Sequence, residues 1–149
     1  MSNSPEYASL RQRVEEAFDN RDLITEGNEQ ASQKHIAAVD EVLEKLDRGQ
    51  LRVAEKSEGE WITHAWVKQA VLLYFILAKM EVIETGPFEF FDKIPLKKNL
   101  KEQGVRVLPP GTIRYGAHVE RGAVVMPGYI NIGAYVSSGT MVDTWATVG

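Results

Sequence analysis

The sequence contains no cysteine. This excludes disulfides, zinc sites with thiolate ligands and catalysis by a cysteine nucleophile. Long apolar runs are also missing, since the most apolar stretch, Ala65 to Ala78, is broken by Lys68 and Gln69 and is too short to cross a bilayer. The N-terminus lacks the basic flank and apolar run of a signal peptide. We therefore expect a globular cytoplasmic protein that has no membrane partner.

Positive charge is in short supply as well. Seventeen Lys and Arg face twenty-one Asp and Glu, which gives a net charge of −4 over 149 residues. A mildly acidic chain is a poor candidate for non-specific binding to nucleic acid. We expect no nucleic-acid partner.

Glycine is scarce in the first part of the chain and charge is scarce in the last part. Residues 1–103 hold four of the twelve glycines, and residues 104–149 hold the other eight. Only five of the 38 charged residues lie after position 103. Two kinds of structure are therefore expected to join near Gly104, a helical domain over 1–103 and a different domain over 104–149.

Apolar periodicity in the first domain predicts helices with a short hairpin between them. A first helix starts near Pro5, a second runs from about Asn28 to Arg48, and a third covers His64 to Met80. The third is apolar on most sides and should be the most buried element. Short strands are expected at Leu51 to Glu55 and Trp61 to Thr63, around a turn at residues 57–60.

An extended aromatic stretch, Phe88 to Leu96, leads into a run of lysines that includes Lys93, Lys97, Lys98 and Lys101. One interpretation is a solvated linker, and the other is a surface that faces an anionic ligand.

A six-residue repeat fills the second domain. Aliphatic residues recur every six positions, with a single step of five between Val125 and Ile130, at Val107, Ile113, Val119, Val125, Ile130, Val136, Val142 and Val148. Glycine follows three residues after most of them. This period fits neither a helix nor an ordinary strand and is typical of the hexapeptide form of a parallel β-helix, with three units to each triangular coil. The five-residue step marks either an adjusted corner or a loop that leaves the coil.

Several segments carry a family resemblance. They are the stretch that begins at Leu51, Phe91-Asp-Lys-Ile-Pro, Gly104-Val-Arg-Val-Leu-Pro-Pro and, above all, Met126 to Gly149. Together they resemble the tetrahydrodipicolinate N-succinyltransferases of bacterial lysine and diaminopimelate synthesis. The resemblance covers nearly the whole chain but only the N-terminal part of the family.

The resemblance implies a fold and an assembly. The family has an N-terminal helical domain, a left-handed parallel β-helix and a C-terminal β domain, and it forms homotrimers with active sites between neighbouring β-helices. This chain would then hold the first domain and an incomplete β-helix. The later coils, the C-terminal domain and the family's proposed catalytic base would lie beyond residue 149.

The resemblance also implies a reaction. Succinyl passes from succinyl-CoA, a co-substrate, to the amino group of opened tetrahydrodipicolinate, with no permanently bound cofactor and no metal. Arg106 and Asp143 match family substrate-binding positions, the first for a carboxylate and the second for the substrate amine. Thr144 and Trp145 are weaker candidates, and Trp145 takes the place of a repeat glycine.

Each candidate also has a purely structural interpretation. Arg106 would be a surface arginine at the domain junction, Asp143 would cap its own turn, and Trp145 would pack against a neighbouring chain. Ser137 and Ser138 occupy a position where the family resemblance leads us to expect Asp-Glu.

Two further alternatives remain at this stage. Many hexapeptide acetyltransferases use a histidine base, and the repeats contain one histidine, His118, at a position expected to face solvent. A protein of another class, a non-catalytic oligomerisation or binding module built on hexapeptide repeats, is the alternative to the enzyme. We expect the 149-residue chain alone to have no succinyltransferase activity.

Overall fold

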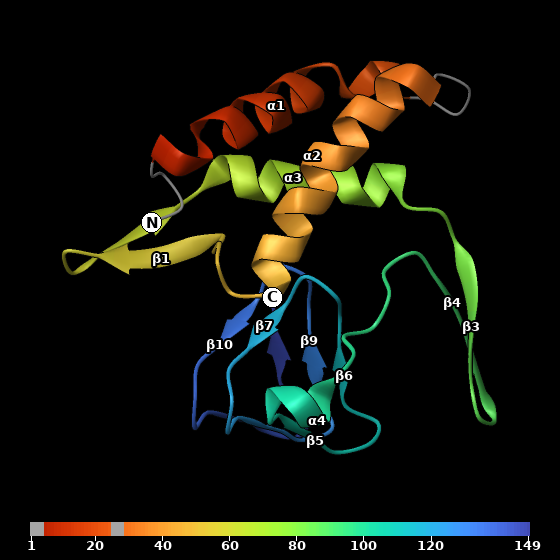
Figure 1. Ribbon diagram of the computed structural model, residues 1–149. Coiled ribbons are helices and arrows are strands. Elements are labelled where there is room, and N and C mark those ends of the chain that lie inside the picture. The colour runs from red at the N-terminus through yellow and green to blue at the C-terminus, as the bar shows by residue number, and fades with distance from the viewer. Residues whose placement is uncertain (1–4, 25–28) are drawn as a thin grey trace.

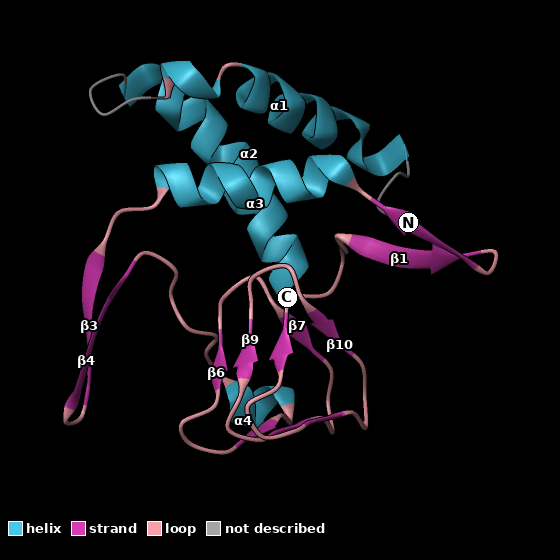
Figure 2. Ribbon diagram, turned by 180° about the vertical axis from the view of Figure 1, so that it is seen from behind, coloured by secondary structure: helices cyan, strands magenta, loops and turns pink. Residues whose placement is uncertain are grey.

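The computed structural model describes residues 5–24 and 29–149. A helical layer lies above a stack of short strands, and two β-hairpins extend from either side of the helices (Figures 1 and 2). The helical layer contains 3-10 turns at Pro5–Tyr7 and Arg21–Leu23, and the helices α1 (Ala8–Asp19), α2 (Glu29–Asp47) and α3 (Ala65–Leu77). The short helix α4 (Leu100–Gln103) lies beside the strands (Figure 1).

The first three helices form the core of the helical layer. Their apolar residues recur at spacings of three and four, so each helix presents one stripe to the others. The buried side chains include Val14 on α1, Leu43 on α2 and Leu73 on α3, all fully or almost fully enclosed. The predicted helices are thus present, although the proposed start of the second at Asn28 lies outside the described residues.

Helix α3 corrects two expectations. It ends at Leu77 rather than Met80, because Ala78 already has an extended backbone. It is also less buried than its apolar sequence led us to expect, since Leu72 and Ile76 are 44% and 48% exposed. Its other face packs on α1 and α2, so the exposed residues lie where no element covers the helix.

The predicted hairpin is present, but its first strand covers Ala54–Ser57 rather than Leu51 to Glu55. Strands β1 (Ala54–Ser57) and β2 (Glu60–Thr63) pair in antiparallel fashion around Glu58 and Gly59, both with positive φ. Paired positive-φ residues suit a two-residue hairpin turn because their twist matches that of the strands.

A second hairpin was missed. Strand β3 (Glu81–Thr85) pairs with β4 (Phe88–Asp92), so the aromatic stretch is half of a hairpin rather than a simple extended segment. Helix α4 was likewise not foreseen, because four residues are too few to show a periodicity.

The repeat forms eight two-residue strands, and in each the repeated aliphatic residue comes second. They are β5 (Arg106–Val107), β6 (Thr112–Ile113), β7 (His118–Val119), β8 (Val124–Val125), β9 (Tyr129–Ile130), β10 (Tyr135–Val136), β11 (Met141–Val142) and β12 (Thr147–Val148). Every strand pairs in parallel with the strand three units away, which gives three stacked sheets, β5-β8-β11, β6-β9-β12 and β7-β10. This is the arrangement expected for the start of a β-helix.

The repeated aliphatic side chains form a second core between the three sheets. Val125 and Ile130 are completely buried in it. The five-residue step leaves the stacking intact, because the corner between β8 and β9 has three residues, 126–128, where the neighbouring corners have four. The step is therefore an adjusted corner and not an outgoing loop.

Candidate functional site

Arg106 and Asp143 lie on the same sheet. Arg106 opens β5 and pairs through Val124 of β8 with Met141 of β11, and Asp143 is the first residue after β11. The second residue of each strand points into the core, so the first points outward. Arg106 and Asp143 are both exposed.

The two side chains do not touch. Two strand spacings, about 10 Å, separate Arg106 from Met141, and Asp143 lies two residues beyond Met141 along the chain. Among the residues that the structure describes, the guanidinium of Arg106 has no ion-pair partner. The sheet therefore presents a cation and a carboxylate on one face.

Asp143 makes the hydrogen bond expected of a turn-capping residue. Its Oδ1 accepts from the backbone N–H of Thr144 at 2.7 Å. The side chain remains exposed, so its second oxygen is open to solvent. The turn contact fixes the carboxylate's direction and leaves one oxygen for a ligand.

Trp145 occupies the left-handed conformation that glycine supplies in other units. Its φ is +60°, against +70° to +86° for Gly116, Gly122, Gly133 and Gly139. Its backbone N–H donates to the carbonyl of Pro127, and its side chain is 76% exposed. Backbone strain in an exposed bulky residue is unusual and concentrates at functional sites. Thr144, also exposed, precedes it in the same corner.

A second polar cluster, which was not predicted from the sequence, surrounds Glu120. Tyr135 donates from its hydroxyl to Glu120 Oε1, and the N–H of Ser138 donates to Oε2 at 2.7 Å. Both hydrogen bonds lower the pKa of Glu120, and the one from Tyr135 has the larger effect. Burial raises the pKa of Tyr135, and its hydrogen bond to Glu120 raises it further.

The position of Glu120 in the repeat was the available signal. It follows the inward Val119 just as Asp143 follows the inward Val142. Ser138 stands where the family resemblance led us to expect an acidic residue. It is held in the cluster by a second hydrogen bond, in which its hydroxyl donates to the carbonyl of Arg121 at 2.8 Å. The guanidinium of Arg52 lies 3.3 Å from the centroid of the Tyr135 ring and completes the cluster.

The expectation that His118 faces solvent is wrong. The residue is half-buried, and its Nδ1 lies 3.0 Å from the carbonyl oxygen of Asp47 at the end of α2. Its ring also contacts the ring of Tyr135, with centroids 4.9 Å apart. His118 therefore joins the helical layer to the strands.

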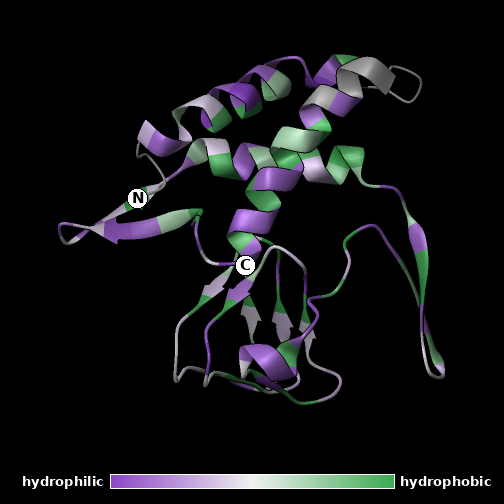
Figure 3. Cartoon of the chain, in the orientation of Figure 1, coloured by the Kyte–Doolittle hydropathy of each residue, from purple (hydrophilic) through white to green (hydrophobic). Residues whose placement is uncertain are grey.

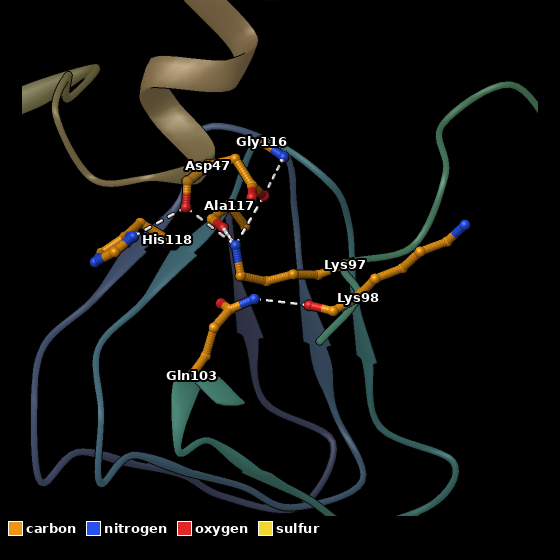
Figure 4. A network of polar contacts seen from close by, with 7 residues as sticks. All are labelled: Asp47, Lys97, Lys98, Gln103, Gly116, Ala117 and His118. Atoms are coloured by element: carbon orange, nitrogen blue, oxygen red, sulfur yellow. Dashed lines mark hydrogen bonds and ion pairs between the residues drawn. The ribbon is translucent and has the colours of Figure 1, made fainter. Parts of the chain in front are cut away.

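Lys97 fits neither interpretation of the lysine run. It is only 6% exposed, and its Nζ donates to Asp47 Oδ1 at 2.8 Å and to the carbonyl of Ala117 at 2.9 Å (Figure 4). The same carboxylate oxygen accepts from the N–H of Gly116 at 3.0 Å. This lysine is thus neither a solvated linker residue nor open to an anionic ligand. It ties α2 to the first repeats.

Lys93 is similarly engaged, since its Nζ donates to the carbonyl of Phe75 at 2.8 Å. Lys98 and Lys101 remain exposed.

Over residues 5–24 and 29–149, no group of three or more His, Asp or Glu side chains is placed to hold a metal ion. In the same part of the chain, no helix has the length and apolar character needed to span a membrane.

The architecture is that of a class of proteins in which a helical domain is joined to stacked hexapeptide strands. Sequence comparison indicates which family within this class the chain resembles. Residues 9–77 match the family described as "Tetrahydrodipicolinate N-succinyltransferase N-terminal". The chain is similar to the N-terminal half of the 2,3,4,5-tetrahydropyridine-2,6-dicarboxylate N-succinyltransferases, which confirms the resemblance found in the sequence.

Three relatives of that name illustrate the match. The protein of Sodalis glossinidius is 50% identical over 147 residues, 95% of this chain and 53% of its own length. That of Idiomarina loihiensis is 48% identical with the same coverage. That of Acinetobacter baylyi is 49% identical over 142 residues, 91% of this chain and 51% of its own. The chain spans about half the length of the curated relatives it matches.

Proposed function

We propose that this chain is the N-terminal part of an acyltransferase that moves succinyl from succinyl-CoA to the amino group of opened tetrahydrodipicolinate. The observation that carries the proposal is identity of about one half with the named N-succinyltransferases over nearly all of this chain. The substrate and co-substrate follow from the relatives' name and from the family resemblance. We place the reaction in the cytoplasm, without a permanently bound cofactor or metal.

The proposal includes a fold and an assembly. The stacked sheets would be the first coils of a left-handed parallel β-helix over 104–149, attached to a helical domain over 1–103. Three copies would assemble so that the outer face of β5-β8-β11 lies at a cleft between neighbours. The cation and carboxylate on that face support this choice, because the substrate carries both kinds of charge.

The chemistry is a direct acyl transfer. The substrate amine attacks the thioester carbonyl carbon, the new C–N bond forms, the C–S bond breaks, and the amine proton leaves through a base while CoA departs as a thiol. Arg106 would grip a substrate carboxylate through two parallel hydrogen bonds. The open oxygen of Asp143 would hold and orient the amine. Thr144 and Trp145 would line the same corner.

The test compares two proteins in one assay. Thiol release from succinyl-CoA in the presence of tetrahydrodipicolinate would be measured for the 149-residue chain and for a version continued to the full length of its relatives. We expect turnover only in the longer protein. Turnover by the 149 residues alone would refute the need for further chain. An inactive but folded long protein would refute the enzyme and favour the non-catalytic module.

A further inference from the structure

The β3–β4 hairpin, residues 81–92, projects from the helical layer as an arm (Figures 1 and 2). Its base is fixed on two sides. Asp92 Oδ2 pairs with an Nη of Arg114 at 2.9 Å, and Lys93 donates to the carbonyl of Phe75. The arm therefore has a set direction, although its outer part has little contact with the rest of the chain.

Both faces of the arm expose apolar side chains. Val82 pairs with Phe91 on one face, and these are 58% and 66% exposed. The other face carries Phe88 and Phe90, which are 65% and 51% exposed. Figure 3 shows strongly hydrophobic residues along this arm beside hydrophilic ones. A two-stranded hairpin is marginally stable by itself in water, and clustered exposed aromatics mark an interaction surface.

The arm also concentrates negative charge. Residues 81–92 contain four carboxylates and no lysine or arginine. Glu84 stands directly opposite Glu89, and like charges in that arrangement destabilise a hairpin. Among the described residues, neither has a cation as an ion-pair partner. A cationic partner would relieve this repulsion while it covers the aromatic rings.

The chain itself offers a surface with an excess of positive charge, three cations around α4 against the one carboxylate of Glu102. Lys98 lies just before α4, and Lys101 lies on it. Arg121 lies beside α4, with an Nη donating to the carbonyl of Glu102 at 2.8 Å. All three are exposed, and within the described part of the chain none has an ion-pair partner. We call Lys98, Lys101 and Arg121 the basic turn.

We propose that the β3–β4 arm of one copy of this chain docks on the basic turn of a second copy. The two surfaces differ, so the contact is heterologous, and repetition of it closes a ring when the rotation allows. A ring of three copies needs this kind of contact. This contact adds detail to the assembly in the proposed function. It rests on the proposed function for the number of copies and is independent of the proposed reaction.

A charge-swap experiment tests the pairing. Sedimentation velocity over a concentration series would measure association of the 149-residue chain, of E84K/E89K, of K98E/K101E and of the quadruple variant. E84K/E89K keeps two like charges opposite each other, so the repulsion within the hairpin is the same kind as in the wild type. We expect each double variant to weaken association at least tenfold and the quadruple variant to restore most of it.

Two further variants keep the result clear. E58K/E60K makes the same change in net charge at the tip of the β1–β2 hairpin and should leave association unchanged. Phe90→Ser should weaken it, with far-ultraviolet circular dichroism confirming that each protein is folded. Unchanged association in both folded double variants, failure of the quadruple variant to recover, or a chain that is monomeric throughout would overturn the inference. Because the readout is association, its failure is distinct from an absence of turnover.

Discussion

Trp145 places a bulky side chain on a backbone conformation that favours glycine. The left-handed conformation costs a residue with a Cβ about 1–2 kcal/mol, and four other repeat corners avoid most of this cost with Gly116, Gly122, Gly133 and Gly139. A tryptophan kept at such a position suggests that its exposed indole has a task outside its own corner. Sequence reasoning found the break in the pattern, and the structure supplies its physical meaning.

The strain at Trp145 can be measured by comparing two truncations. Both W145G and W145A remove the indole, but only alanine retains the Cβ that conflicts with φ +60°. We expect W145G to exceed W145A in free energy of unfolding by about 1 kcal/mol, determined by urea denaturation. A more stable W145A would show that the corner holds no such strain. The same pair at the exposed Met141 serves as a control, since there glycine should be the weaker substitution.

Glu120 provides a pH-dependent test. Because hydrogen bonds lower its pKa in the folded protein, it contributes stability above its unfolded pKa, and this contribution disappears as the pH falls through the folded value. The melting temperature of the wild type should therefore fall more steeply than that of Glu120→Gln below about pH 4.5. Parallel curves for the two proteins would contradict this. Glu102→Gln, at an exposed site on α4, is the matched control.

Arg106 and Asp143 can be tested in the longer protein. We expect Arg106→Ala and Asp143→Asn each to lower kcat/KM by about tenfold or more, as is typical when a charged contact to the substrate is lost. Steady-state kinetics of thiol release would measure the effect, with Arg11→Ala on α1 as an exposed arginine control. Wild-type kinetics in either variant would remove that residue from the proposed site.

At the scale of elements, regular periodicity was predictable and isolated pieces were not. The inward aliphatic residue of all eight repeat strands could be read from the spacing of six, because one side of every strand must fill the same core. The β3 strand was hidden, since Glu81 to Thr85 has too few apolar residues to be separated from the end of α3. The burial of Lys97 was also unpredictable, because its partner Asp47 is fifty positions earlier.

The joint between α2 and the repeats depends on that lysine. Lys97→Ala would leave the Asp47 carboxylate and the carbonyl of Ala117 without their shared donor. Losing one partner of a buried ion pair typically costs about 3–5 kcal/mol, and since Asp47 is partly exposed we expect a loss near the lower value in urea unfolding. Lys98→Ala, next in the chain and exposed, should change stability by less than about 0.5 kcal/mol. Equal effects of the two substitutions would contradict a structural role for the joint.

At the scale of the whole molecule, the two hydrophobic cores are in direct contact. Ile132, from the repeats, belongs to the helical core, and Gly116 has no room for a side chain against Leu43 of α2. The change in composition near Gly104 indicates where one kind of sequence ends, but packing across the joint is a property of the folded chain. The assembly of several copies lies a further step from the sequence, since it depends on how exposed surfaces such as the arm and the basic turn fit together.

The three-residue corner at positions 126–128 changes how the repeat must be counted. Residues stacked on one another are 18 apart where Val107 meets Val125 and where Ile130 meets Val148, but 17 apart where Ile113 meets Ile130. The strands keep the same stacking order, but partners on either side of this corner are one residue closer in the sequence. A single residue inserted at this corner would restore an even spacing of eighteen, whereas the same insertion within a strand would turn an aliphatic side chain out of the core. Changes of length in this part of the chain should therefore be accommodated at corners, and a comparison that permits no gap there will misalign every later repeat.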